Sequence, residues 1–258
     1  MKDYSMRFDS IKRLYGQKAL KSIRDAHVAV IGLGGVGSWS VEALVRSGIG
    51  NLSLVDKDEI CLSNINRQIH ATSDTVNRSK ALVLKERSFS IAPECKVTTF
   101  DMYYNVTTSK HILSYDFDYI IDAIDSVEQK CLLISECIKV NKNIITCGGA
   151  GGKKDPKNLK FDDLSKTKYD PLLLQVRKKL RKEYGFPNYG IKSFGIKCLY
   201  SEEKPKEPEC DFNNATLISN SSNRSFNCDY GFGSSTMMTG TMGFLLADYV
   251  ISQIANIN

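Results

Sequence analysis

Short apolar runs alternate, over the first 150 residues, with segments in which apolar residues recur at helical spacing. Such runs are typical of strands buried on both faces of a sheet. They predict strands at 27–31, 51–55, 95–100, 117–121 and 143–147. The segments with helical spacing predict helices at 7–24, 38–46, 82–91 and 127–140. Strands that alternate with helices indicate an α/β class: a doubly wound, Rossmann-like and mainly parallel sheet.

The pattern changes after Gly152, where a basic stretch begins. Residues 171–183 predict an amphipathic helix, with Asp170 as its cap and Pro171 in its first turn. We expect a single domain over 1–258, in which 1–152 is a nucleotide-binding core and 153–258 a basic helical insertion with a C-terminal extension. Further elements are expected as a strand at 196–200, a mobile loop at about 202–230 and a buried helix at 236–254.

The net charge of +6 is concentrated in one part of the chain. Residues 153–182 hold eleven Lys and Arg against four Asp, which is +7 there and 6 − 7 = −1 for all other residues. With 42% hydrophobic and 25% charged residues, the composition excludes a wholly disordered chain. A concentrated basic segment favours an acidic partner, such as nucleic acid.

The N-terminal residues are charged throughout and lack the apolar run of an export signal, so we expect a cytoplasmic protein with reduced thiols. The eight cysteines include no C-x-x-C pair, which argues against a ribbon-type zinc site. Most are expected to be inert, with Cys210 and Cys228 as the two that merit attention. Asp248 and several threonines interrupt the apolar stretch at 236–254, so no membrane association is expected.

A glycine turn follows the first predicted strand and opens a helix. It reads Gly32-Leu-Gly34-Gly35-Val-Gly37 and satisfies G-x-G-x-x-G. Bare backbone N–H groups at a helix N-terminus bind phosphate. Asp56 ends the second strand, where a carboxylate can hold ribose hydroxyls. This combination predicts a nucleotide without distinguishing NAD from ATP.

Residues beyond the second strand favour a triphosphate. Arg67 can make forked contacts with phosphate oxygens, and Lys80 can place a point charge on them. Asp122 and Asp125 follow the fourth strand and suit a magnesium ion that bridges phosphates. For Asp122, a role as a turn cap is equally compatible with the sequence. The predicted nucleotide-binding residues are Gly32, Gly34, Gly35, Gly37, Asp56, Asp58, Asn64, Arg67, Gln68, Lys80, Asp122, Asp125 and Ser126.

In order along the chain, the motifs GLGGVGS, VDKD, SNINRQ, RSKA and DAIDS resemble the ubiquitin-activating-enzyme-like superfamily of ThiF, MoeB and HesA proteins. The resemblance implies that ATP adenylates a carboxylate, with Arg67, Lys80 and Asp125 as catalytic residues and Asp125 as the magnesium ligand. It also implies a homodimer in which a neighbouring subunit lends an arginine. Ser10 stands at the aligned place, so Arg7 or Arg13 is the candidate here.

The second half resembles one branch of the superfamily, the tRNA threonylcarbamoyladenosine dehydratases. The resemblance rests on RFDSIKRLYG, YDPLL, VRKKLR and YSE, and on GSS leading to TGT. It implies ATP-dependent adenylation of a threonine carboxylate on tRNA, followed by ring closure with loss of water. A monovalent cation and a cysteine desulfurase or sulfur-acceptor partner also belong to what it implies. The tRNA phosphates are then expected on Lys153, Lys154, Arg177, Lys178, Lys179 and Arg181.

Two other classes stay open at this point. One is an adenylyltransferase for the C-terminus of a ubiquitin-like or sulfur-carrier protein. It would exchange pyrophosphate in response to that protein and without RNA. The other is a NAD-dependent oxidoreductase or a nucleotide-binding module without catalysis. A change in nicotinamide absorbance, or ATP binding without pyrophosphate release, would identify it.

Overall fold

The computed structural model describes residues 2–190, 192–206 and 232–255. Its strands are β1 (His27–Ile31), β2 (Asn51–Val55), β3 (Lys96–Phe100), β4 (Tyr119–Asp122), β5 (Ile144–Cys147), β6 (Leu159–Asp163) and β7 (Lys197–Ser201). In the described residues they form one sheet of order β3-β2-β1-β4-β5-β7-β6. All neighbours are parallel except β6, which runs antiparallel to β7. The doubly wound, mainly parallel prediction is confirmed.

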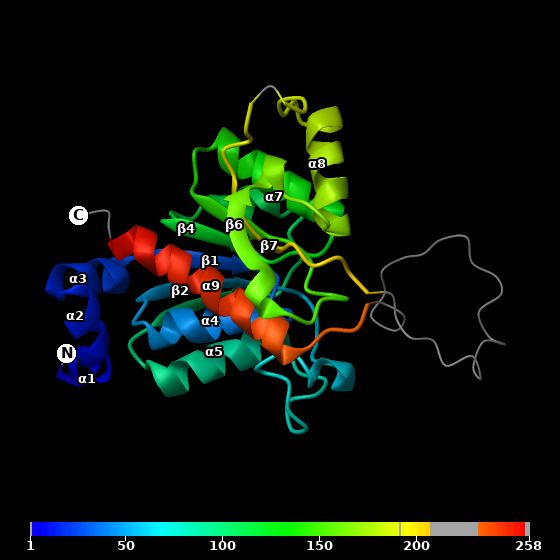
Figure 1. Cartoon of the computed structure of the whole chain (residues 1–258). Helices are drawn as coiled ribbons and strands as arrows, with labels where there is room; N and C mark the ends of the chain where they lie inside the picture. The colour runs from blue at the N-terminus through cyan, green and yellow to red at the C-terminus, as the bar shows by residue number, and fades with distance from the viewer. Residues whose placement is uncertain (1, 191, 207–231, 256–258) are drawn as a thin grey trace, which may run out of the picture.

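Helices cover both faces of this sheet (Figure 1). The longer ones are α4 (Gly37–Arg46), α5 (Lys80–Ile91), α7 (Val127–Lys139), α8 (Pro171–Glu183) and α9 (Thr236–Ala255). Side chains of α4, α5 and α9 pack in one core cluster, and those of α7 and α8 pack in another. Shorter helical segments within the sheet region are α6 (Ser109–Leu113), η1 (Leu62–Asn64), η2 (Pro156–Asn158) and η3 (Leu164–Lys166).

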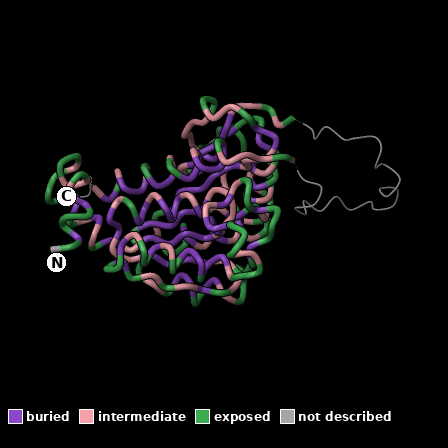
Figure 2. Tube along the Cα trace, turned by 90° about the horizontal axis from the view of Figure 1, so that it is seen from below, coloured by how far each residue is buried: buried purple, intermediate pink, exposed green. Residues whose placement is uncertain are grey.

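Strand β1 shows how the sequence divides the core into these two clusters. Val28 and Val30 point to the face of α4 and α9, whereas Ala29 and Ile31 point to the face of α7. Successive side chains of a strand alternate between faces, so a run of apolar residues is required where both faces are covered. The central strands are buried along their length in Figure 2, and the exposed residues lie around them.

The prediction of one continuous N-terminal helix over 7–24 is wrong. The structure has three helices there: α1 (Lys2–Arg7), α2 (Asp9–Tyr15) and α3 (Gln17–Asp25). Gly16 separates α2 from α3 with a φ of +90°, which is outside the helical region and favours glycine. Phe8, between α1 and α2, is buried against the core. The apolar spacing survives these breaks because all three helices pack on the same side.

One element of the second half differs from expectation, and one confirms it. Strand β6, which lies within the basic stretch, was not predicted, since its residues are all partly exposed at the sheet edge. The buried helix predicted at 236–254 is confirmed by the long helix α9, which packs against α4 and α3. Among the described residues, no helix combines the length and apolar character needed to cross a bilayer. Most of the segment predicted as a mobile loop, with Cys210 and Cys228, lies outside the described residues.

Candidate functional site

The glycine turn between β1 and α4 is packed tightly on one side and open on the other. Gly32 has a φ of +90°, and a Cβ there would lie 2.7 Å from the carbonyl oxygen of Ala123. A Cβ on Gly37 would meet the carbonyl oxygen of Gly32 itself. A Cβ on Gly34 would meet nothing within 4 Å. Gly32 and Gly37 are therefore required by the turn, while Gly34 leaves backbone that a ligand can approach.

Asp56, at the end of β2, fastens this turn. Its Oδ2 accepts a hydrogen bond from the Leu33 N–H at 2.7 Å, and its Oδ1 accepts one from the Asp58 N–H at 2.8 Å. Burial raises the pKa of Asp56, although the charge of Lys80 acts in the opposite direction. Each carboxylate oxygen keeps a free lone pair, so the side chain remains able to accept from ribose hydroxyls.

A charged cluster stands beside Asp56. The Lys80 Nζ lies 2.8 Å from Asp58 Oδ2, and the Tyr103 hydroxyl donates to Asp58 Oδ1 at 2.8 Å. The Lys80 side chain is only 8% exposed, so its ammonium is held in one place. Burial alone would raise the pKa of Asp58, but the hydrogen bond and charge of Lys80 together with Tyr103 lower it. Tyr103 was missed, because it follows β3 without a motif around it.

Arg67 is held against the glycine turn by its own backbone. Its carbonyl oxygen accepts from Trp39 Nε1 at 3.0 Å and from Thr239 Oγ1 at 3.2 Å. A Cβ on Gly35 would lie 3.6 Å from Arg67 Cγ. The Arg67 guanidinium donates to the Ser63 carbonyl oxygen at 2.6 Å. The structure thus brings Arg67 next to the glycine turn, as the phosphate-binding prediction requires, and adds Trp39 and Thr239 as its supports.

Two amide side chains beside Arg67, those of Asn64 and Gln68, are buried. Asn64 Oδ1 accepts from the Cys61 N–H at 3.1 Å and closes the turn that carries Arg67. Gln68 is also buried, and its Oε1 has no partner among the described residues. The Asn64 bond supports a role for that residue in shaping the loop that presents Arg67.

His70 follows in the same loop and is fully enclosed. Neither ring nitrogen has a hydrogen-bond partner among the described residues. Burial lowers the pKa of His70 to about 3, and the positive charges of Lys80 and Arg87 lower it further. The ring is therefore neutral in the folded protein throughout the range in which an exposed histidine titrates. Nothing in the sequence distinguished this histidine.

We predict that His70 makes the fold sensitive to mild acid. Between pH 6.5 and about 3 the unfolded chain binds a proton at His70 that the folded chain does not, so stability falls as the pH falls. The slope is about 1.4 kcal/mol per pH unit for one such group. Urea unfolding at pH 7 and pH 5 should show that His70→Leu loses about 2 kcal/mol less than wild type on acidification. A His111→Leu control, which removes an exposed histidine, should behave as wild type; equal losses in all three proteins would contradict the prediction.

The prediction for Asp122 as a ligand is wrong, because the side chain is fully buried. Its Oδ2 lies 2.8 Å from Lys130 Nζ and accepts from Thr146 Oγ1 at 2.6 Å. Its Oδ1 accepts from the Ile124 N–H at 3.1 Å, so it caps the turn after β4. Asp125, in that turn, is exposed. Ser126 precedes α7 without a side-chain cap bond.

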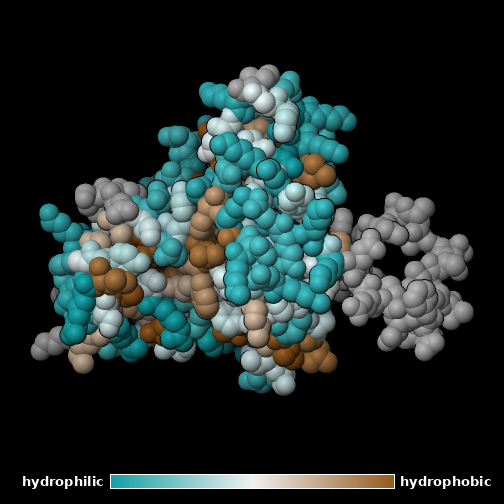
Figure 3. Space-filling model, in the orientation of Figure 1, coloured by the Kyte–Doolittle hydropathy of each residue, from teal (hydrophilic) through white to brown (hydrophobic). Residues whose placement is uncertain are grey.

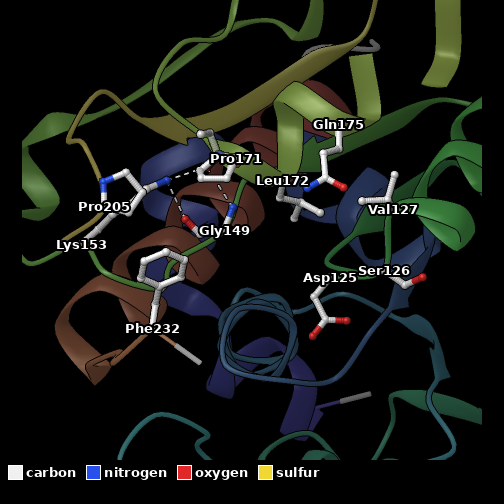
Figure 4. Close-up of a pocket in the computed structure, with 12 residues that line it drawn as sticks. Asp125, Ser126, Val127, Gly149, Lys153, Pro171, Leu172, Gln175, Pro205 and Phe232 are labelled. Atoms are coloured by element: carbon white, nitrogen blue, oxygen red, sulfur yellow. Dashed lines mark hydrogen bonds and ion pairs between the residues drawn. The ribbon is translucent and has the colours of Figure 1, made fainter. Parts of the chain in front are cut away.

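Asp125 borders a cavity of about 370 Å³ between the C-terminal edge of the sheet and α8. Figure 4 shows its walls, with Asp125, Ser126 and Val127 on one side and Phe232 and Pro205 on the other. Pro171, Leu172 and Gln175 come from α8, and Gly149, Gly151, Lys153 and Asp170 complete the lining. The glycine turn, Asp56, Arg67 and Lys80 are not part of it. The described residues also contain no group of three or more side chains placed to hold a metal ion.

Lys153 was predicted to contact tRNA phosphates, and this is wrong. Its ammonium is buried 2.5 Å from Asp170 Oδ2 and donates to the Gly149 carbonyl oxygen at 2.7 Å. Asp170 also accepts from the N–H groups of Gly149 and Leu173, the latter as the cap of α8. Because Lys153 and its carboxylate partner are both enclosed, this ammonium is neutralised and cannot reach phosphates in solvent.

Of the remaining basic residues, some are held by contacts within the protein and others are exposed. Lys179 lies between Glu128 and Glu183, at 2.6 and 2.8 Å, and its side chain is 17% exposed. Arg177 donates to Thr167 Oγ1, and Arg181 donates to the Pro187 carbonyl oxygen and stacks over Phe194. Lys154 and Lys178 are exposed, as are further lysines of the same region: Lys157, Lys166, Lys168 and Lys182. Figure 3 shows the hydrophilic surface over α8.

Arg7 and Arg13 were the candidates for the arginine that a neighbouring subunit lends. Arg7 pairs with Asp3 and donates to the Ile91 carbonyl oxygen, while Arg13 pairs with Asp9 and is 80% exposed. The choice between them as the arginine lent to a neighbour stays a prediction.

Five cysteines are buried in the described residues, and burial raises the pKa of their thiols, to about 12 for most of them. This agrees with the prediction that they are inert. They are Cys95, Cys131, Cys137, Cys147 and Cys198.

The fold and this sheet edge define a doubly wound α/β protein with a glycine turn of the nucleotide-binding type. The model of the ThiF family matches residues 8–258, and the chain belongs to this family. A tRNA threonylcarbamoyladenosine dehydratase of Haemophilus influenzae is 44% identical over 255 residues, which cover 98% of this chain and 94% of that protein. The corresponding protein of Escherichia coli K12 is 39% identical over 97% of this chain and 94% of its own length.

Solved structures agree with this assignment. A crystal structure of the E. coli tRNA N6-threonylcarbamoyladenosine dehydratase in complex with ATP matches with a TM-score of 0.88 and 38% identity, covering 98% of this chain and 96% of that chain. The E. coli protein MccB with ATP matches with a TM-score of 0.64 and 18% identity, covering 98% of this chain and 64% of that chain. At that identity the MccB likeness concerns the fold alone.

Proposed function

We propose that this protein uses ATP to dehydrate threonylcarbamoyladenosine in tRNA. The observation that carries the proposal is the end-to-end similarity to dehydratases, which includes the second half with α8. The geometry supports it, because a glycine turn with Arg67 beside it stands next to an Asp125-bordered cavity that can receive an acceptor. This is the arrangement that activation of a carboxylate by ATP needs.

The reaction requires two anions, the threonine carboxylate and ATP, to come into contact. An oxygen of the threonine carboxylate attacks the α-phosphorus of ATP, an O–P bond forms, and pyrophosphate leaves. A nitrogen or oxygen of the carbamoyl group then attacks the activated carbonyl carbon, an N–H proton of that group is lost, and AMP is expelled. Arg67 and Lys80 are proposed to hold the phosphates, Gly34 and Gly35 to let the backbone approach them, and Asp56 to bind the ribose. Positioning and charge neutralisation then supply most of the catalysis.

Asp125 is proposed as the Mg²⁺ ligand. Its exposed carboxylate stands at the end of β4, beside the turn that packs on Gly32. Mg²⁺ is commonly bound through one or two carboxylates together with substrate phosphates and water, which fits a single carboxylate here. When bound, the ion would neutralise developing charge on the phosphates. A homodimer and a cytoplasmic location are further proposals, supported by the family resemblance. The monovalent cation and the sulfur-transfer partner stay sequence-based expectations.

The function is tested by incubating the protein with tRNA that carries threonylcarbamoyladenosine, ATP and Mg²⁺, followed by mass spectrometry of the nucleosides. We expect a nucleoside lighter by one water molecule and one pyrophosphate released for each conversion. An unaltered nucleoside would contradict the proposal. Pyrophosphate exchange that depends on a ubiquitin-like or sulfur-carrier protein, without RNA, would instead support the alternative of a protein adenylyltransferase.

The tRNA surface is proposed to include the exposed lysines of α8. Lys178→Glu combined with Lys182→Glu should lower tRNA affinity roughly tenfold at moderate salt and reduce its salt dependence, since each phosphate contact releases counterions. Arg177 and Arg181 are poor test positions because both make contacts within the protein. Filter binding at two salt concentrations measures the effect, with Lys110→Glu and Lys139→Glu, two exposed lysines elsewhere, as the control. Equal affinity of test and control variants would refute the assignment.

A further inference from the structure

The cavity beside Asp125 has the lining of a site for a flat, largely uncharged group. Its walls come from Pro171 and Leu172 of α8 on one side and from Pro205 and Phe232 on the other (Figure 4). Lys153 and Asp170 also reach it, but they neutralise one another at 2.5 Å. Among the described lining residues, Asp125 therefore carries the net charge. The carboxamide of Gln175 borders the same space and is exposed.

The sheet order separates this cavity from the place of the activating nucleotide. Asp56 follows β2 and the glycine turn follows β1, while the cavity is built past β4, from the loop after β5 and from α8. Asp125, which follows β4, lies between the two regions. At about 370 Å³ the cavity falls at the small end of ligand sites, which span about 300–1,000 Å³.

We propose that this cavity binds the modified adenine of the substrate, with Phe232 as the stacking surface and Gln175 as the hydrogen-bonding residue for the base and its carbamoyl group. The inference rests on the proposed function. An aromatic ring is the usual platform for an unpaired base in a protein. A glutamine carboxamide offers the donor and acceptor pair that matches an adenine edge. The threonine carboxylate then points to the Asp125 end, where it meets the α-phosphate.

The experiment compares Phe232→Leu, Phe232→Tyr and Gln175→Ala in the full-length protein. Steady-state kinetics are measured separately for modified tRNA and for ATP. Phe232→Leu is expected to raise KM for the tRNA, or to lower kcat/KM, by about tenfold or more through the loss of stacking. Phe232→Tyr keeps a ring and should stay within about twofold of wild type. Gln175→Ala should weaken the tRNA parameter alone, since Gln175 is exposed and its loss leaves the fold intact.

Two control variants match these changes. Gln17→Ala removes an exposed glutamine from α3, and Ile138→Ala removes a part-exposed apolar side chain from the far end of α7. Both should behave as wild type. KM for ATP should be unchanged in every variant, because the glycine turn does not line the cavity.

The outcomes separate this inference from the proposed function. If wild type converts the tRNA and Phe232→Leu matches it in the tRNA parameters, the cavity assignment is overturned and the function stands. A variant that raises KM for ATP instead would show that the cavity holds the activating nucleotide, which also overturns the assignment. If wild type converts no tRNA under these conditions, the proposed function fails and the cavity assignment fails with it.

Discussion

Arg67→Ala is expected to lower turnover by about 10³-fold while the protein stays folded. A guanidinium that neutralises phosphate charge in the transition state has an effect of this size. Arg67 is held beside the glycine turn by backbone bonds to Trp39 and Thr239, which the substitution leaves in place. Lys80→Ala should have a comparable effect, since its ammonium is almost fully enclosed and fixed by Asp58.

Pyrophosphate release and nucleoside conversion measure this effect, and circular dichroism checks the fold. Arg46→Ala is the matched control, because Arg46 pairs with Glu42 at the far end of α4 and its side chain is 59% exposed. The control should keep wild-type turnover. Near-normal rates in Arg67→Ala or in Lys80→Ala would show that the triphosphate binds elsewhere on the sheet edge.

Lys130→Met is expected to destabilise the protein by about 3–5 kcal/mol, because it leaves the buried carboxylate of Asp122 without a counter-charge. Both side chains are fully buried, 2.8 Å apart. Burial alone would lower the pKa of Lys130, but the charge and hydrogen bond of Asp122 outweigh it and raise the pKa. For a chain of this length the loss corresponds to a fall in Tm of about 10 °C.

Thermal unfolding and urea titration measure this loss. The control is Lys21→Met, which breaks the surface pair with Asp25, whose side chains are 75% and 58% exposed. Exposed pairs contribute about 0–1 kcal/mol, so the control should unfold close to wild type. A Lys130→Met protein as stable as the control would mean that Asp122 becomes protonated or finds another partner at no cost.

The core strands and the glycine turn were predictable because their signals are local. Strands buried on both faces need unbroken apolar runs, and the turn from β1 to α4 needs glycine where a Cβ would strike backbone. Strand β6 could not be found in this way. Its residues are half-exposed and pair only with β7, far along the chain, so its sequence shows no apolar run.

The roles of charged residues were harder to predict, because the burial of a side chain is a property of the tertiary fold. Lys153 stands in a run of lysines and has the same local signal as Lys154, yet one is enclosed with Asp170 and the other is exposed. Asp122 and Asp125 are separated by two residues and differ in the same way. The sequence predicted that both carboxylates lie at this edge of the sheet, where the structure has them. It did not distinguish the buried carboxylate from the exposed one.

The contacts of α9 with the Arg67 loop set the order in which the site can be completed. Thr236 and Thr239, at the start of α9, bond to the carbonyl oxygens of Asn66 and Arg67, about 170 positions earlier in the chain. On a ribosome, which makes the chain from its N-terminus, the glycine turn and the Arg67 loop emerge long before these threonines. A nascent chain that stops before α9 would therefore lack these bonds to the Arg67 loop, so the loop gains its full set of contacts only after α9 has been made.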